Sequence, residues 1–173
     1  SRRSPFFRSG PTLSLGPIPP EEFKKYLSGK FTKSGMSVLS DRLDEILAAS
    51  DNIPFNVQYL CHALWIVKEG GGNVSSEDVR RGVEYIFAAE REYYTALWDQ
   101  LSLHQRRTLR ALARSGGAAP FTVAFLREHD LGPSASVARS LGQLLKRDVL
   151  KKSGTEYRFA DPFLKAWILS TMP

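Results

Sequence analysis

The adjacent residues Cys61 and His62 combine a thiol with an imidazole, the pairing used in nucleophilic catalysis. Both fall in a predicted apolar helix, where a cysteine is usually a packing residue, and we expect His62 to be structural as well. The carboxylates Asp41, Asp44 and Glu45 are expected on the outer face of another helix. No Ser-His-Asp arrangement with supporting spacing occurs. The sequence therefore predicts that this chain has no catalytic site of its own.

Phosphate and metal chemistry are not indicated either. The glycines at 70–72 have no predicted strand before them and no lysine after them, so we expect a linker rather than a phosphate loop. The chain has one cysteine, which excludes an internal disulfide framework. Its three histidines are scattered, without the spacing of a zinc site. We predict no metal site.

The distribution of charge gives the strongest functional signal. The net charge of the 173 residues is +6. Residues 1–74 carry 9 basic and 7 acidic side chains, residues 75–103 carry 3 and 6, and residues 104–173 carry 12 and 5. A segment of seventy residues with this excess of positive charge is the kind of module that DNA attracts.

Within this basic segment, a predicted helix and a predicted hairpin supply the candidate DNA-binding residues. The helix is expected to expose Ser134, Ser136, Arg139, Ser140, Gln143, Lys146 and Arg147, and the hairpin adds Lys151, Lys152 and Arg158. Arginine and glutamine can read base edges, whereas serine and lysine more often meet phosphates. The alternatives are that these are solvated faces, or that the module docks onto protein. The arginines at 106, 107, 110 and 114 lie on an earlier helix that need not face DNA.

The order of elements predicts a mainly α fold that ends in a winged helix-turn-helix. Apolar spacing and capping signals indicate helices over 20–34, from 37 or 40 to 49, 54–67, 76–101 with one break between 88 and 94, 103–115, 122–129, 134–147, and from 162 onward. A short strand is expected at 12–15 and a hairpin over 149–159. We predict a tail with a final core strand over 1–19, a helical lid-type bundle over 20–101 and a winged-helix domain over 102–173.

Composition limits the class of protein. With 42% hydrophobic and 24% charged residues, the chain can form a globular core. No run approaches the ~20 apolar residues of a membrane span, and no signal core follows the basic N-terminus. We therefore expect a cytoplasmic protein that does not contact a membrane. The chain begins with Ser1 rather than methionine, as expected of a fragment.

Several motifs, taken in order, resemble a known family. They are the run LGPIP at 15–19, PFNVQYLCHALW at 54–65, LWDQLS at 97–102, LGPSASV at 131–137 and DPFLKAW at 161–167. Together they resemble the C-terminal half of archaeal and bacterial AAA+ ATPases of the STAND group. Each motif is weak alone, but the series spans nearly the whole chain.

The resemblance implies that a P-loop domain binding ATP and Mg²⁺ precedes this chain, which supplies its last strand, helical lid and winged helix. In such ATPases a Gly-x-Pro turn of the lid lies near the nucleotide. Here the turn reads Asn52-Ile53-Pro54, and asparagine tolerates the left-handed backbone that glycine would supply. The resemblance also suggests that Arg8 senses phosphate. The alternatives are an ordinary proline-started helix and a basic tail.

Two other functions stay open at this point. The chain is also compatible with a free-standing winged-helix transcriptional regulator, whose N-terminal helices dimerise or sense a ligand. A protein-interaction adaptor that docks through the winged helix is a third possibility. The sequence does not indicate the oligomeric state.

Overall fold

The computed structural model of the chain describes residues 18–117 and 119–172. Within these ranges the fold is mainly helical, as predicted, with two small two-stranded sheets. The elements of the first lobe are α1 (Pro20–Lys33), β1 (Met36–Ser37), α2 (Ser40–Ala49), α3 (Pro54–Val67), β2 (Gly72–Asn73) and α4 (Ser76–Ala89). Arg8 and the strand predicted at 12–15 lie outside the described residues.

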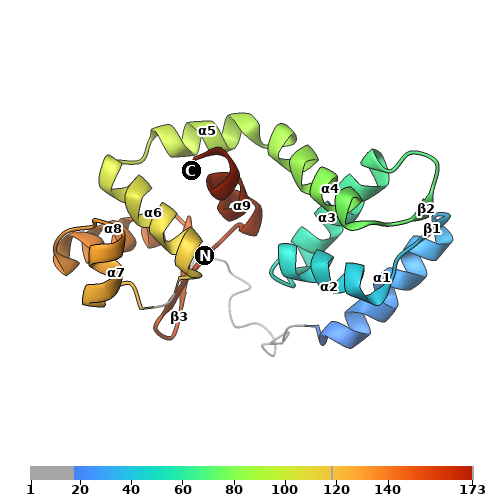
Figure 1. Ribbon diagram of the computed structural model, residues 1–173, viewed down its shortest axis with the longest axis horizontal. Helices are drawn as coiled ribbons and strands as arrows, with labels where there is room; N and C mark the ends of the chain where they lie inside the picture. Colours follow the sequence, from blue (N-terminus) through green and yellow to red (C-terminus); the bar gives the residue numbers. More distant parts are fainter. Residues whose placement is uncertain (1–17, 118, 173) are drawn as a thin grey trace, which may run out of the picture.

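The second half of the chain begins with a connecting helix and ends in a winged helix. Its elements are α5 (Arg91–Asp99), α6 (Leu103–Ser115), α7 (Val123–Glu128), α8 (Ser134–Lys146), β3 (Leu150–Ser153), β4 (Glu156–Phe159) and α9 (Pro162–Thr171). Figure 1 shows α1–α4 at one end of the molecule and α6–α8 with the hairpin at the other, with α5 spanning between them and α9 beside α5.

Side chains cap the starts of helices α4, α6, α7 and α9. Ser75 and Asp78 form a reciprocal capping box at the start of α4, and Ser102 and Gln105 do the same for α6. The long helix predicted over 76–101 breaks at Glu90, inside the predicted interval, and becomes α4 and α5. These boundaries follow from side chains within one turn of each helix end, which is why the sequence indicates them.

The first lobe also contains a strand pair that the sequence does not indicate. Strand β1 runs parallel to β2, with Met36 opposite Gly72. The glycines at 70–72, predicted as a simple linker, are therefore partly a strand. A Cβ atom at Gly71 would lie 2.8 Å from the carbonyl oxygen of Gly35, so the two loops approach too closely for any side chain there.

The winged helix has its own buried core. Hairpin strands β3 and β4 are antiparallel, with Leu150 opposite Phe159. Both side chains are buried, together with apolar residues of α6 and α8: Leu109, Leu112, Val137, Leu141 and Leu144. The backbone N–H of Tyr157 in β4 donates to the carbonyl of Gly117, 3.2 Å away, which attaches the wing to the end of α6.

Aromatic side chains pack α9 against the connecting helix α5 and against the first lobe. The ring of Trp167 in α9 lies 5.6 Å from that of Tyr94 and 6.3 Å from that of Trp98, both on α5. Phe163, also in α9, meets Tyr59 of α3 edge-on at 6.2 Å. Helix α9 therefore contacts the first lobe as well as the winged helix. A boundary between 101 and 102 stays a prediction.

Candidate docking surface and lid turn

Helix α8 occupies the recognition-helix position of the winged helix and carries most of the predicted DNA-binding residues. Ser134, Arg139, Gln143 and Lys146 are exposed along it, while Ser136 is half-buried. The helix begins directly after Pro133, so the backbone amides of Ser134 and Ala135 have no carbonyl partner within the helix, and both residues are exposed. This face can meet a groove of DNA or a protein surface.

Ser140 is not exposed, contrary to the sequence prediction. It is 5% accessible, and its Oγ lies 2.8 Å from Nδ1 of His104 on α6. Nε2 of the same imidazole is 3.0 Å from the carbonyl oxygen of Leu131. The reason is helical periodicity, because position 140 falls on the same face as the buried Val137 and Leu144. Ser140 thus helps fix α8 on α6.

Two further polar residues of this surface are also held by neighbouring elements. Gln105 Nε2 of α6 donates to Oε1 of Gln143 at 2.8 Å. Arg147 donates to the side-chain oxygen of Gln100 at 2.7 Å and to its carbonyl at 3.3 Å. These contacts orient Gln143 and Arg147 toward the protein. The free charge of α8 therefore lies mainly at Arg139 and Lys146.

The wing adds cations on one edge. Lys151 and Lys152 are exposed on β3, and Lys151 stands opposite Arg158 of β4. Arg158 pairs with Glu156 at 2.9 Å, so part of its charge is neutralised. In the described part of the chain, no carboxylate lies within 4.0 Å of the charged groups of Arg139, Lys146 or Lys151. Together with Lys152, whose ammonium lies near the Tyr157 ring and also has no carboxylate partner in the described ranges, they are the cations best placed for a phosphate.

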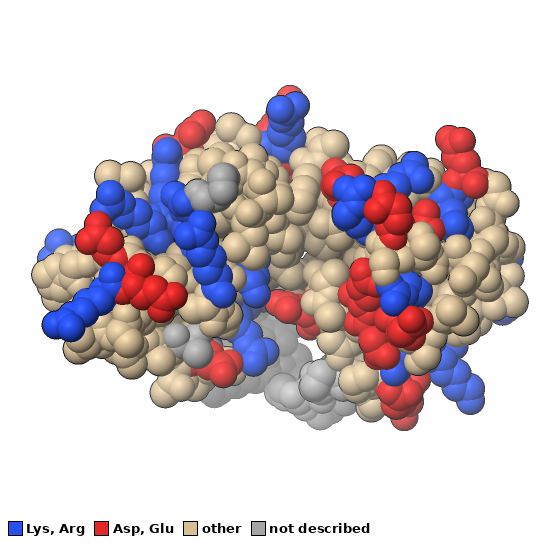
Figure 2. Space-filling model, viewed as in Figure 1, with Lys and Arg blue, Asp and Glu red and all other residues tan. Residues whose placement is uncertain are grey.

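Other arginines of the winged helix point elsewhere. Arg106 donates to the carbonyl of Trp98 at 2.9 Å and covers the indole ring, so it serves the α5–α6 corner. Arg107, Arg110 and Arg114 of α6 line a cavity of about 300 Å³ together with residues 128–130 at the end of α7. Figure 2 shows basic side chains running across the half of the molecule that holds the winged helix.

The turn at residues 51–54 has a left-handed backbone, and its predicted nucleotide contact stays a prediction. Asp51 and Asn52 have φ angles of 51° and 53°, in the left-handed region, and Pro54 is the first residue of α3. The same turn ends α2, since the N–H of Asn52 donates to the carbonyl of Leu47 at 2.8 Å. Asn52 Nδ2 also donates to the carbonyl of Ile18 at 3.4 Å. Asparagine therefore takes the conformation that glycine would supply.

Unsatisfied polar atoms also gather at this turn. Over residues 18–117 and 119–172, the buried side-chain oxygens without a hydrogen-bond partner are Ser50 Oγ and Asn52 Oδ1. Buried polar atoms almost always have a partner, so the hydroxyl of Ser50 and the amide oxygen of Asn52 are free to accept hydrogen bonds at this turn. Arg8, the other predicted nucleotide contact, lies outside the described residues.

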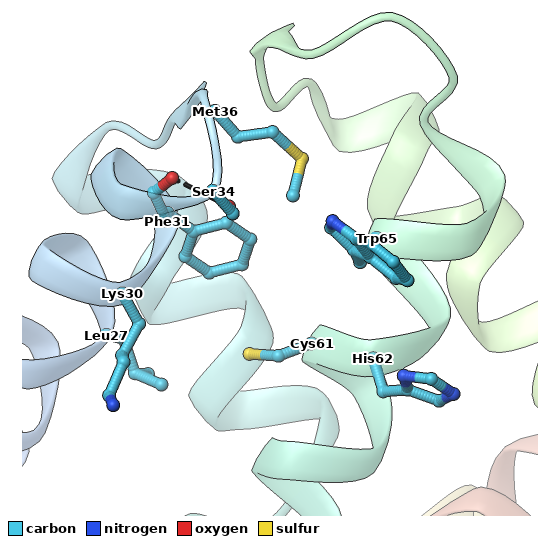
Figure 3. A pocket seen from close by; sticks show the side chains of 8 residues that line it. All are labelled: Leu27, Lys30, Phe31, Ser34, Met36, Cys61, His62 and Trp65. Atoms are coloured by element: carbon cyan, nitrogen blue, oxygen red, sulfur yellow. Dashed lines mark hydrogen bonds between the residues drawn. The ribbon is translucent and has the colours of Figure 1, made fainter.

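Sequence analysis did not find a groove between α1 and α3, shown in Figure 3. Burial raises the pKa of the Cys61 thiol to about 12, which fits the predicted packing role rather than a nucleophile. His62, expected to be structural, is exposed and stacks near Trp65, with ring centroids 6.5 Å apart. The groove forms between two helices that are far apart in the sequence, so no local sequence pattern indicates it.

Comparison with known proteins supports the fold of the second half. The model of the family described as "Probable winged helix domain" matches residues 92–170. No curated protein and no solved structure matches the chain significantly. None of the helices in the described ranges has the length and hydrophobicity needed to cross a bilayer. Fold and family match agree that the C-terminal part of this chain is a winged-helix region.

Proposed function

We propose that this chain is the lid and winged-helix region of a nucleotide-switched AAA+ ATPase of the STAND group. It is non-catalytic alone, and its winged helix docks to DNA or protein. The observation that carries the proposal is the pair of unsatisfied buried oxygens, Ser50 Oγ and Asn52 Oδ1, at a left-handed turn before a proline-started helix. In the complete protein, a nucleotide held by the preceding domain would supply hydrogen-bond donors to these two oxygens.

The residues of the turn fit such a ligand. The amide oxygen of Asn52 and the hydroxyl of Ser50 accept hydrogen bonds from amino or hydroxyl groups, which a nucleotide carries on its base and ribose. The N-terminus of α3 adds unpaired amides and partial positive charge beside Pro54. ATP with its Mg²⁺ would be held chiefly by the preceding P-loop domain, and it would supply the phosphoanhydride whose hydrolysis resets the switch.

The experiment that tests this part concerns the whole protein. The coding sequence upstream of Ser1 is expected to contain a Gly-x-x-x-x-Gly-Lys-Ser/Thr loop, and its absence would refute the ATPase. In the complete protein, Asn52→Val is expected to weaken nucleotide binding because a β-branched residue resists positive φ. Asn52→Gly keeps the left-handed turn and loses only the amide oxygen, so it should weaken nucleotide binding less than Asn52→Val does. The present chain alone should show no ATP turnover.

The docking role rests on α8 and the wing. Arg139, Lys146 and Lys151 lack carboxylate partners in the described ranges and are exposed, so they are available to phosphates. Binding of a DNA duplex should weaken steeply with salt, and replacing both Arg139 and Lys151 by alanine should lower the slope of log K against log [salt] by about 2. Lys25→Ala, an exposed lysine of α1, is the control.

The DNA titration also separates the candidate functions. Salt-dependent binding that is lost with Arg139 and Lys151 supports DNA docking, whether in the ATPase or in a free-standing regulator, and the upstream sequence distinguishes those two. A shallow salt slope, or no effect of the double change, excludes DNA contact by this face. The winged helix would then dock onto protein, as in an adaptor.

A further inference from the structure

The groove between α1 and α3 has a volume of about 230 Å³ and mainly apolar walls, and Lys30 stands at its edge. Leu27, Phe31 and Met36 form one side, and Cys61 and Trp65 of α3 form the other. In Figure 3, Met36 and Phe31 point toward Trp65 across the space, while Cys61 points toward α1. Lys30 stands on the α1 side with its ammonium at the groove's lower end in this view.

The size and exposure of the groove favour a protein side chain as its occupant. Pockets for drug-sized ligands usually measure ~300–1,000 Å³, so this one is closer to the volume of a single aromatic residue. Trp65 is 60% exposed and Tyr26, on α1, is 53% exposed. Trp65 lines the groove, and Tyr26 lies beside the lining residue Leu27 in the sequence of α1; exposed tryptophan and tyrosine are enriched among the residues that dominate protein interfaces.

The charge of the groove's edge indicates what accompanies that side chain. Lys30 lines the groove and Lys33 lies one turn further along α1. Neither ammonium lies within 4.0 Å of a carboxylate in the ranges that the structure describes, although Lys30 is near the Tyr26 ring. Lys24, by contrast, is already paired with Glu21 and Asp44. The groove therefore suits an aromatic anchor that carries a neighbouring carboxylate.

The chain presents such an anchor on its own surface. Tyr93 of α5 is 60% exposed and directly follows the exposed Glu92, which has no ion-pair partner among the described side chains. Residues 75–103 hold six acidic and three basic side chains, whereas α1 is rich in lysine. Figure 1 places α5 on the span between the lobes, away from α1, which forms one wall of the groove, so Tyr93 does not fill the groove of its own molecule.

We propose that the α1–α3 groove docks the Tyr93 face of α5 from a second copy of the chain, with Glu92 facing Lys30. The two contacting surfaces differ, so the contact is heterologous and leaves a free groove and a free Tyr93 at the ends of each assembly. Repetition of the contact builds a ring or an open chain rather than a closed symmetric dimer.

Sedimentation velocity of the chain over a range of concentrations tests this interaction. The weight-average mass of the unaltered chain should rise with concentration. Trp65→Ala and Tyr93→Ala should each weaken association at least about 10-fold, since each removes an anchor residue of the contact. Leu103→Ala, which removes an equally exposed apolar side chain from α6, is the control and should not change it. Thermal melts confirm that all variants fold.

Mixing the Trp65→Ala and Tyr93→Ala variants distinguishes specific docking from non-specific association. Trp65→Ala keeps a usable Tyr93 face and Tyr93→Ala keeps a usable groove, so the mixture should form one-to-one dimers that cannot grow. Lys30→Glu and Glu92→Lys should likewise each weaken association and restore it in combination. A chain that stays monomeric at all concentrations overturns the proposal. Association that Tyr93→Ala leaves unchanged, or a mixture that stays monomeric, means that another partner occupies the groove and overturns it equally.

Discussion

The wing contacts the end of α6 at Gly117. Replacing this glycine tests how much the stability of the winged helix depends on the close approach of the β4 backbone to Gly117. Gly117 has a φ of +85°, and a Cβ built on it would lie 1.9 Å from the carbonyl oxygen of Tyr157. Ordinary contact begins at 3.4 Å, so the methyl group would overlap a backbone atom that cannot rotate away. The adjacent Gly116 also has a positive φ, +75°, but a Cβ there meets nothing within 4 Å.

Alanine variants of the two glycines therefore distinguish the cost of a left-handed backbone from the cost of a steric clash with the wing. Gly116→Ala incurs only the left-handed conformation, about 1–2 kcal/mol of the free energy of unfolding. Gly117→Ala incurs the same strain, loses the 3.2 Å hydrogen bond from the Tyr157 N–H, worth about 1 kcal/mol, and must displace the wing. We expect Gly117→Ala to destabilise the protein by at least about 3 kcal/mol in total.

Urea unfolding followed by tryptophan emission measures both free energies, because Trp98 and Trp167 are buried beside the winged helix. Binding of the α8–wing partner should also weaken for Gly117→Ala and stay unchanged for Gly116→Ala, since only the first moves Lys151. If the two alanine variants lose equal stability, close approach of the wing to α6 does not determine the fold of this region.

Three further predictions concern single side chains. The Ser75 backbone N–H and then the Lys68 ammonium lower the pKa of Asp78 to about 2, below the 3.8 of an ordinary aspartate. The Asp78 carboxylate therefore contributes fully to the free energy of unfolding above about pH 4, and this contribution is lost as the pH falls toward 2. In Asp78→Asn, the free energy of unfolding should change less between about pH 4 and pH 2 than in the unaltered protein. Tyr94 donates to Asp161 Oδ2 at 2.7 Å, so Tyr94→Phe should lower the free energy of unfolding by about 1–2 kcal/mol, measured in urea. Because burial raises the pKa of Cys61 to about 12, its reaction with a thiol reagent at pH 8 should be slow when folded and fast in denaturant.

Sequence reasoning succeeded where the determining residues are neighbours in the chain. Ser75 with Asp78 and Ser102 with Gln105 are three residues apart, so the pattern predicts each capping box and helix start. The hairpin follows from alternating residues around a short turn. The left-handed backbone at Asn52 follows from residue type and the resemblance together.

Prediction from the sequence failed where the interacting residues are far apart in the chain. Met36 and Gly72 pair as strands across thirty-six residues, with too few residues in either strand to show alternation. Ser140 was misassigned because a serine resembles a surface residue, and only the fold brings it to His104. The groove between α1 and α3 depends on the packing of two helices, which no local pattern reveals.

Tyr59 connects the lid turn to the winged helix in the proposed switch. It lies on α3, the helix that starts at Pro54, and its hydroxyl donates to Glu90, at the break between α4 and α5, at 2.9 Å. The ring of Tyr59 also contacts Phe163 of α9. One side chain therefore contacts both Glu90, where the chain passes from α4 to α5, and α9, which packs against the first lobe. Nucleotide that repositions the start of α3 would therefore move α5 and α9 together, and the winged helix would turn with the lid as one body rather than bend freely at Glu90.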